Sequence, residues 1–172
     1  MKRDYKTIPR DFREPQSRRE AIELINSADR EILLIAGELS AYQYPDLRSA
    51  AESAVERGVS FKVYACSPDQ DTVNRLLYNG FEVYLLSEKP SNHNMIVDGV
   101  SYMKTVTKGK TYLKKYINDP AGARKLKKKF AMYMKKPREA KIEGEDPLII
   151  ALQSPIDSGV KTDSSKIHEY FG

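Results

Sequence analysis

The sequence predicts an α/β fold in which a mostly parallel sheet is covered by helices on both faces. Three short apolar runs, at residues 31–36, 60–66 and 81–86, have the length and composition of buried strands. Each run follows a segment in which apolar residues recur at helical spacing. Alternation of helix and strand along a chain is typical of right-handed crossovers between parallel strands.

The helices are predicted from capping residues at their N-termini and glycines after their C-termini. The first is expected to begin at Ser17, because Ser17 and Glu20 have the spacing of a capping box. The next two are predicted over residues 46–57 and 70–78, and a glycine soon follows each of them. Residues 1–14 are polar and aperiodic, so they are predicted to form an N-terminal arm.

The stretch from Ser91 to Thr105 predicts two short strands joined by a tight turn. An apolar run ends at Asp98-Gly99, and this dipeptide is a strong hairpin signal because glycine accepts a positive φ. His93 precedes the run and Asp98 closes it. Two polar groups at the ends of a buried strand suggest chemistry, and the alternative is a hydrogen-bonded histidine beside a turn-capping aspartate.

Basic side chains are concentrated in one block. Residues 104–141 carry 14 basic and 2 acidic side chains, a net charge of +12, whereas residues 1–103 and 142–172 carry −3 and −4. Such a block favours a polyanion as partner, and tyrosines interleaved with the lysines suggest stacking on bases, with a core role as the alternative. The residues predicted to contact phosphates of DNA or RNA are Lys108, Lys110, Lys114, Lys115, Arg124, Lys125, Lys127, Lys128, Lys129, Lys135 and Lys136.

The last helix lies inside this block. It is predicted to begin at Asp119-Pro120, a capping residue followed by proline, and to run to about Lys136. Beyond it, residues 137–172 are acidic and predict a loosely held tail, in which residues 148–152 could add an edge strand.

Composition excludes several classes of protein. No window is long and apolar enough for a membrane span, and the charged N-terminus lacks the apolar segment of a secretory signal. The single cysteine, Cys66, falls in an apolar strand, so a buried inert thiol in the cytoplasm is expected. No zinc spacing and no glycine-rich phosphate loop occurs, so no metal or cofactor is predicted.

Over residues 15–136 this layout resembles one half of a phospholipase D-like domain. The matching features are the strand–helix repeats, the apolar strand that ends in Asp98-Gly99, and the helix that follows Asn118-Asp119-Pro120. In that superfamily two such halves close around one phosphodiester, so the resemblance implies a homodimer. Degenerate halves of this kind resemble ligand-sensing or nucleic-acid-associated modules of archaeal-type relatives.

The catalytic motif of the superfamily is altered here. Active members carry His-x-Lys-x4-Asp, in which the histidine is the nucleophile and the lysine holds phosphate oxygens. With Asp98 as the family aspartate, Ser91 stands at the nucleophile and His93 at the lysine. With His93 as the nucleophile, Met95 replaces the lysine and Val100 the aspartate. Neither alignment restores the set, so Ser91, His93 and Asp98 are only candidate catalytic residues.

The extreme C-terminus, residues 164–171, resembles the short peptide by which replication and repair proteins dock on the sliding clamp, PCNA. The aliphatic and the two aromatic positions of that motif are filled by Ile167, Tyr170 and Phe171, while Ser164 stands in place of the usual glutamine. These three apolar residues fall on one side of a helical turn, as helix-in-groove binding requires. The alternative is a terminal turn that docks on its own domain.

Three functions follow as hypotheses. The first is a non-catalytic nucleic-acid-binding protein that is recruited to DNA replication or repair by its tail. The second is a phosphodiesterase or nuclease with a rearranged site around His93. The third is a ligand-sensing or assembly module whose basic helix contacts protein partners.

Overall fold

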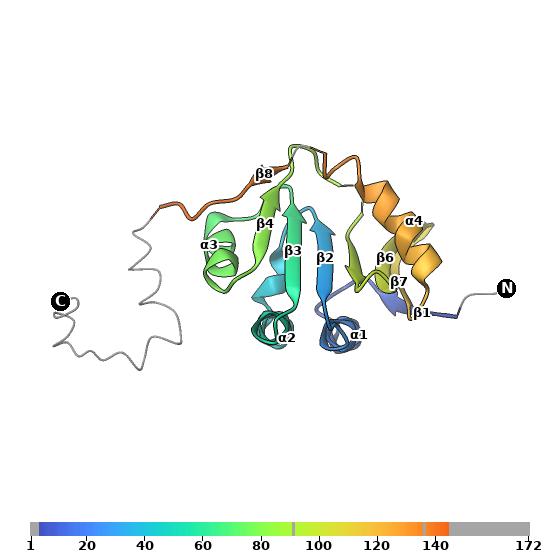
Figure 1. The fold of residues 1–172 in the computed structure, drawn as a ribbon. Coiled ribbons are helices and arrows are strands. Elements are labelled where there is room, and N and C mark those ends of the chain that lie inside the picture. Colours follow the sequence, from blue (N-terminus) through green and yellow to red (C-terminus); the bar gives the residue numbers. More distant parts are fainter. Residues whose placement is uncertain (1–3, 91, 136, 145–172) are drawn as a thin grey trace. The chain divides into compact units, whose positions relative to one another are not determined.

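The computed structural model of this chain describes residues 4–90, 92–135 and 137–144. Residues up to Lys141 form one unit, and every helix and strand described below belongs to it (Figure 1). In chain order the elements are β1 (Tyr5–Pro9), α1 (Pro15–Asn26), β2 (Glu31–Ala36), the 3-10 helix η1 (Ser40–Gln43), α2 (Pro45–Glu56), β3 (Ser60–Ala65), α3 (Gln70–Tyr78), β4 (Glu82–Leu85), β5 (Asn94–Val97), β6 (Ser101–Lys108), β7 (Lys110–Tyr116), α4 (Pro120–Phe130) and β8 (Arg138–Glu139).

The strands form one mixed sheet in the order β1-β7-β6-β5-β2-β3-β4-β8. Only β2–β3 and β3–β4 pair in parallel, and the other neighbours are antiparallel. The α/β class is confirmed, but the expectation of a mostly parallel sheet is wrong. Strand–helix alternation covers only β2 to β4, whereas tight turns reverse the chain between β5, β6 and β7.

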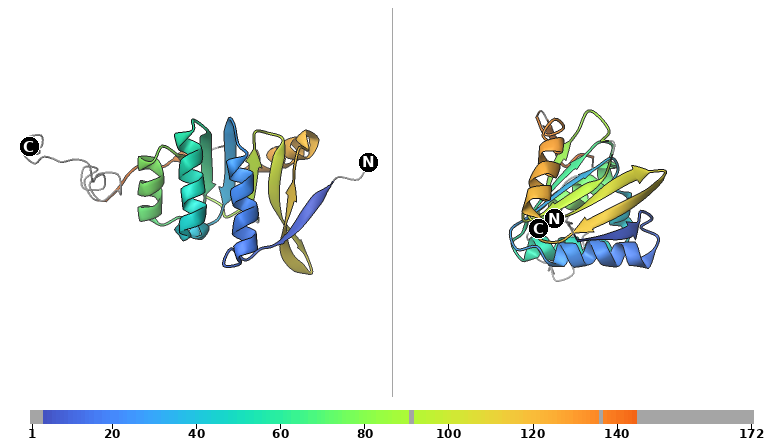
Figure 2. Two further views of the ribbon diagram at one scale, coloured as in Figure 1. Left: turned by 90° about the horizontal axis from the view of Figure 1, so that it is seen from below. Right: turned by 90° about the vertical axis from the view of Figure 1, so that its right-hand side faces the viewer.

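Helices cover both faces of the sheet, as predicted. Figure 2 shows α1, α2 and α3 side by side on one face, with α4 on the other face over β5 to β7. The alternation along β2 explains its continuous apolar run: Ile32 packs with the α1–α3 core, and Leu33 and Ile35 pack with the α4 core.

Part of the predicted N-terminal arm, Tyr5–Pro9, is a strand. β1 pairs with β7 at the edge of the sheet, and Ile8 enters the core. The capping box expected at Ser17 does not form, because α1 begins two residues earlier at Pro15. The Ser17 hydroxyl is buried instead and donates a hydrogen bond to the Pro9 carbonyl at 2.7 Å, which ties α1 to the end of β1.

The C-terminal boundary of the sheet lies beyond the predicted one at residue 136. β8 pairs with β4, and Ala140 is buried and donates its backbone N–H to the Val83 carbonyl at 2.9 Å. The edge strand predicted at residues 148–152 lies outside the described residues. No helix in the described ranges is long and apolar enough to cross a membrane.

Candidate nucleic-acid interface

Helix α4 is fixed to the sheet at its N-terminus. The Asp119 carboxylate caps it by accepting the Gly122 N–H at 3.1 Å, and the same carboxylate accepts the Tyr102 hydroxyl of β6 at 2.7 Å. A Cβ on Gly122 would collide with both of these polar groups, so glycine permits the close approach of helix and strand. The helix ends at Phe130, in a turn over residues 131–134, so its predicted extension to Lys136 is wrong.

The outer surface of α4 is densely basic. Its inward stripe is Ala123, Leu126 and Phe130, and every basic side chain of the helix is exposed. Within residues 4–90, 92–135 and 137–144, none of these cations forms an ion pair with a carboxylate. The exposed basic residues of this segment are Arg124, Lys125, Lys127, Lys128, Lys129 and Lys135, while Lys136 lies outside the described residues.

The β6–β7 hairpin adds lysines on the same side of the sheet. Lys104 faces Lys114 across the pair, and Lys108 faces Lys110. All four alternate in step with Tyr102 and Tyr116, which pack in the α4 core, so they share the face that α4 partly covers. This alternation brings lysines that are distant in sequence onto one surface.

Two of these lysines, Lys104 and Lys114, form cation–π contacts with tyrosine rings. The Lys104 Nζ lies 5.5 Å from the ring centre of Tyr116, and the Lys114 Nζ lies 4.0 Å from that of Tyr5. Tyr116 is buried, which is the core role that the sequence also allowed for these tyrosines, whereas Tyr112 and Tyr133 remain partly exposed.

Lys115 does not belong to this surface. It points to the opposite face, is 5% exposed, and its Nζ lies 2.9 Å from a Glu20 carboxylate oxygen and 3.4 Å from one of Glu23. Burial raises the pKa of Glu20, but hydrogen bonds from Lys115 and Lys6 outweigh it and hold that pKa below its usual range. The prediction that Lys115 contacts phosphate is therefore corrected: it is a core cation.

A groove separates the C-terminal half of α4 from β6. Its volume is about 620 Å³, and it is lined by Lys104, Lys128 and Lys129 together with Asn92 and the buried Asn94. Ammonium and amide groups are donors for phosphate oxygens. We call this feature the basic groove; sequence analysis missed its two asparagines, although Asn94 directly faces Lys104 across the β5–β6 pair.

The candidate catalytic residues His93 and Asp98 do not lie close enough to act together. Ser91 lies outside the described residues, and His93 and Asp98 lie at opposite ends of β5, roughly 16 Å apart at about 3.3 Å per residue. The Asp98 carboxylate accepts the backbone N–H groups of Asp29, Arg30 and Glu31, each at 2.8 Å. Burial alone would raise the pKa of Asp98, but these hydrogen bonds lower it below its usual range. The Asp98 carboxylate is therefore ionised and holds the β5–β6 turn against residues 29–31.

His93 lies at the other end of β5, beside the end of β2. Its Nε2 accepts the Gly37 N–H at 3.4 Å, and burial, with Arg10 and Lys89 nearby, lowers its pKa. The imidazole is therefore neutral near pH 7, and in the alignment that matches His93 to the family lysine it would not supply the charge of that lysine. Among the described residues, no group of three or more His, Cys, Asp or Glu side chains could hold a metal ion.

Solved structures share this architecture. Nuc, a phospholipase D family member from Salmonella typhimurium, matches 81% of this chain and 99% of its own, with a TM-score of 0.66 and 18% identity. The chain therefore has a phospholipase D-like fold. NucT from Helicobacter pylori matches 81% of this chain and 99% of its own, with a TM-score of 0.57 and 14% identity.

A third structure with this fold is that of TrmBL2, an archaeal chromatin protein described as showing a novel mode of DNA binding. It matches 81% of this chain and 55% of its own, with a TM-score of 0.61 and 20% identity. No protein-family model and no curated protein matches the sequence.

Proposed function

We propose that this phospholipase D-like chain is a non-catalytic nucleic-acid-binding protein that holds the phosphate backbone in the basic groove and along the adjoining face of β6 and β7. The observation that carries the proposal is the convergence of Lys104, Lys128 and Lys129 on one groove, next to the exposed lysines of the hairpin. The DNA binding described for TrmBL2, which has the same fold, supports it. We include a homodimer and a cytoplasmic location in the proposal.

A salt titration tests this function. Affinity for labelled single- and double-stranded DNA and RNA should fall linearly on a log–log plot against salt, with a slope of about −0.9 per neutralised phosphate on duplex DNA. Fluorescence anisotropy measures it, and the ranking of the four probes identifies the nucleic acid. Absence of binding, or a slope near zero, would instead favour the ligand-sensing or assembly module.

The second candidate, a phosphodiesterase, rests on His93. This side chain lines a polar pocket of about 570 Å³ with Arg10 and Arg13, which could attract a phosphate. We nevertheless expect no release of nitrophenol from bis(p-nitrophenyl) phosphate and no plasmid cleavage, because neither alignment restores the His-Lys-Asp set. Turnover that persists through purification and disappears in His93→Ala would reverse this conclusion.

Recruitment to a sliding clamp is a further part of the proposal, although residues 164–171 lie outside the described residues. Burial of Ile167, Tyr170 and Phe171 would favour binding by about 1.5–3 kcal/mol each, offset by the ordering of the tail. We expect micromolar affinity by calorimetry against the clamp of the source organism. The idea fails if the intact protein gives no heat, or if Tyr170→Ala/Phe171→Ala binds equally well.

A further inference from the structure

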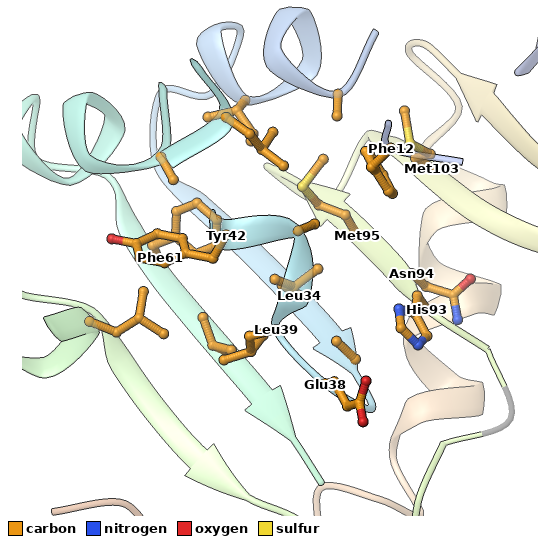
Figure 3. A pocket seen from close by; sticks show the side chains of 18 of the residues that line it. Phe12, Leu34, Glu38, Leu39, Tyr42, Phe61, His93, Asn94, Met95 and Met103 are labelled. Carbon is orange, nitrogen blue, oxygen red and sulfur yellow. The ribbon is translucent and has the colours of Figure 1, made fainter. Parts of the chain in front are cut away.

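A cavity of about 130 Å³ lies within the core between the sheet and helices α1 and α2 (Figure 3). Leu34 of β2 and Met95 of β5 lie along it, with Phe61 toward one end. Sixteen of its 20 lining residues are apolar. Protein interiors are close-packed and contain few voids larger than a water molecule, so a void of this size needs an explanation.

Small side chains leave this space open. Ala21 of α1, Ala36 of β2 and Ala51 of α2 all line the cavity, where larger residues would fill it. An engineered apolar cavity of about 150 Å³ in another protein stays dry and binds benzene. The present cavity is therefore large enough for one small ring and too small for a lipid chain.

One end of the cavity is polar. Figure 3 shows Glu38 and His93 together at that end, away from Tyr42 and Phe61, next to Asn94, whose side-chain oxygen already accepts the Thr105 N–H at 3.1 Å. Because the His93 Nε2 accepts the Gly37 N–H, the ring proton resides on Nδ1. Within the described residues, Nδ1 has no hydrogen-bond partner, and the exposed Glu38 carboxylate forms no ion pair.

The polar side chain of Tyr42, toward the other end of the wall, is already satisfied. The Tyr42 hydroxyl donates to the Glu52 carboxylate, which also accepts the Arg75 Nε at 3.3 Å. Any additional polar group in the cavity is therefore best placed at the His93 end. A hydroxyl suits that end, because it can accept a hydrogen bond from the imidazole Nδ1–H and donate one to a carboxylate.

We propose that this cavity is a binding site for a small, mostly apolar molecule of about the size of benzene that carries one hydroxyl group, for which phenol is the model compound. The ring lies among Leu34, Met95 and the three alanines, and the hydroxyl lies beside His93 and Glu38. Among the described residues, the cavity shares only Asn94 with the basic groove, and the proposal does not depend on nucleic-acid binding.

The full-length protein, labelled at its methionine methyl groups, is titrated with phenol and with benzene and followed by NMR. Met95 and Met103 line the cavity, whereas Met132 on the α4 side is 65% exposed and does not. We expect saturable shifts at Met95 and Met103 with no shift at Met132. One additional hydrogen bond should make phenol bind roughly fivefold tighter than benzene. Absence of saturation, or equal shifts at Met132, overturns the site, and equal affinities overturn the role of the polar end.

Matched variants locate the site. Ala51→Leu fills the cavity and should weaken phenol binding more than about tenfold, since the ring and the new side chain compete for one space. Ala131→Leu makes the same change at an exposed position and should bind as the unmodified protein does. Undiminished binding to a folded Ala51→Leu overturns the proposal. If that variant does not fold, the methionine shifts and the phenol–benzene comparison still decide.

Discussion

Replacement of Lys104, Lys128 and Lys129 by glutamine is expected to weaken nucleic-acid binding about 100-fold at roughly 0.15 M salt, with little dependence on sequence. These three side chains line the basic groove. Each phosphate contact releases counterions and is worth about fivefold in affinity at this salt concentration, and three contacts multiply. The slope of the salt titration should become less steep by about 3.

A matched variant tests whether affinity depends on the groove lysines in particular or on the total positive charge of the surface. Arg124→Gln/Lys125→Gln/Lys127→Gln also removes three positive charges, all of them from α4, but these residues do not line the groove. These side chains lie beside the groove without lining it, and salt screens charges that make no direct contact with the phosphates, so we expect a loss of less than about tenfold. Equal losses in the two variants would contradict the groove and indicate a diffuse basic surface.

The second large effect is expected at Lys115. Lys115→Met should lower the free energy of unfolding by about 3 kcal/mol, because it leaves the buried Glu20 carboxylate without its closest cation. Lys6 remains 3.1 Å from Glu20, but its side chain is 59% exposed, so it compensates only in part. Urea denaturation measures the change, and nucleic-acid affinity should stay unchanged while the protein is folded.

Two controls accompany this prediction. Lys129→Met removes an exposed lysine and should change the stability by less than about 0.5 kcal/mol. Lys115→Met/Glu20→Met replaces the buried pair by apolar side chains and should recover most of the lost stability. If Lys115→Met is fully stable and instead binds nucleic acid weakly, the assignment of Lys115 to the core is wrong.

Local signals in the sequence predicted several parts of the molecule correctly. The apolar runs predicted β2, β3 and β4, since a strand covered on both faces is apolar at most positions. Asp98-Gly99 predicted the β5–β6 turn, and both residues have positive φ, 52° and 70°. Asp119-Pro120 marked the start of α4, because capping and a fixed proline φ act within one turn.

For the candidate nucleic-acid interface, the sequence predicted which segment carries the basic residues but not which of them share a surface. Basic composition located the block, but it assigned Lys114 and Lys115 to the same surface. Neighbouring residues of a strand point to opposite faces, so one of them lies over the ring of Tyr5 and the other is buried beside Glu20. Likewise, His93 and Asp98 were considered together as one catalytic site, but they lie at opposite ends of β5.

The sequence by itself determined the α-helices and strands from α1 to β6, the β5–β6 turn, the start of α4 and the basic composition of residues 104–141. These features depend on periodicity, capping and charge within a few residues. Only the tertiary structure decided the pairing of β1 with β7, the antiparallel position of β5 beside β2, and the convergence of Lys104 with Lys128 and Lys129. Those features depend on contacts between residues far apart in the chain. Local sequence patterns do not specify which strand or sheet face a given element will pack against.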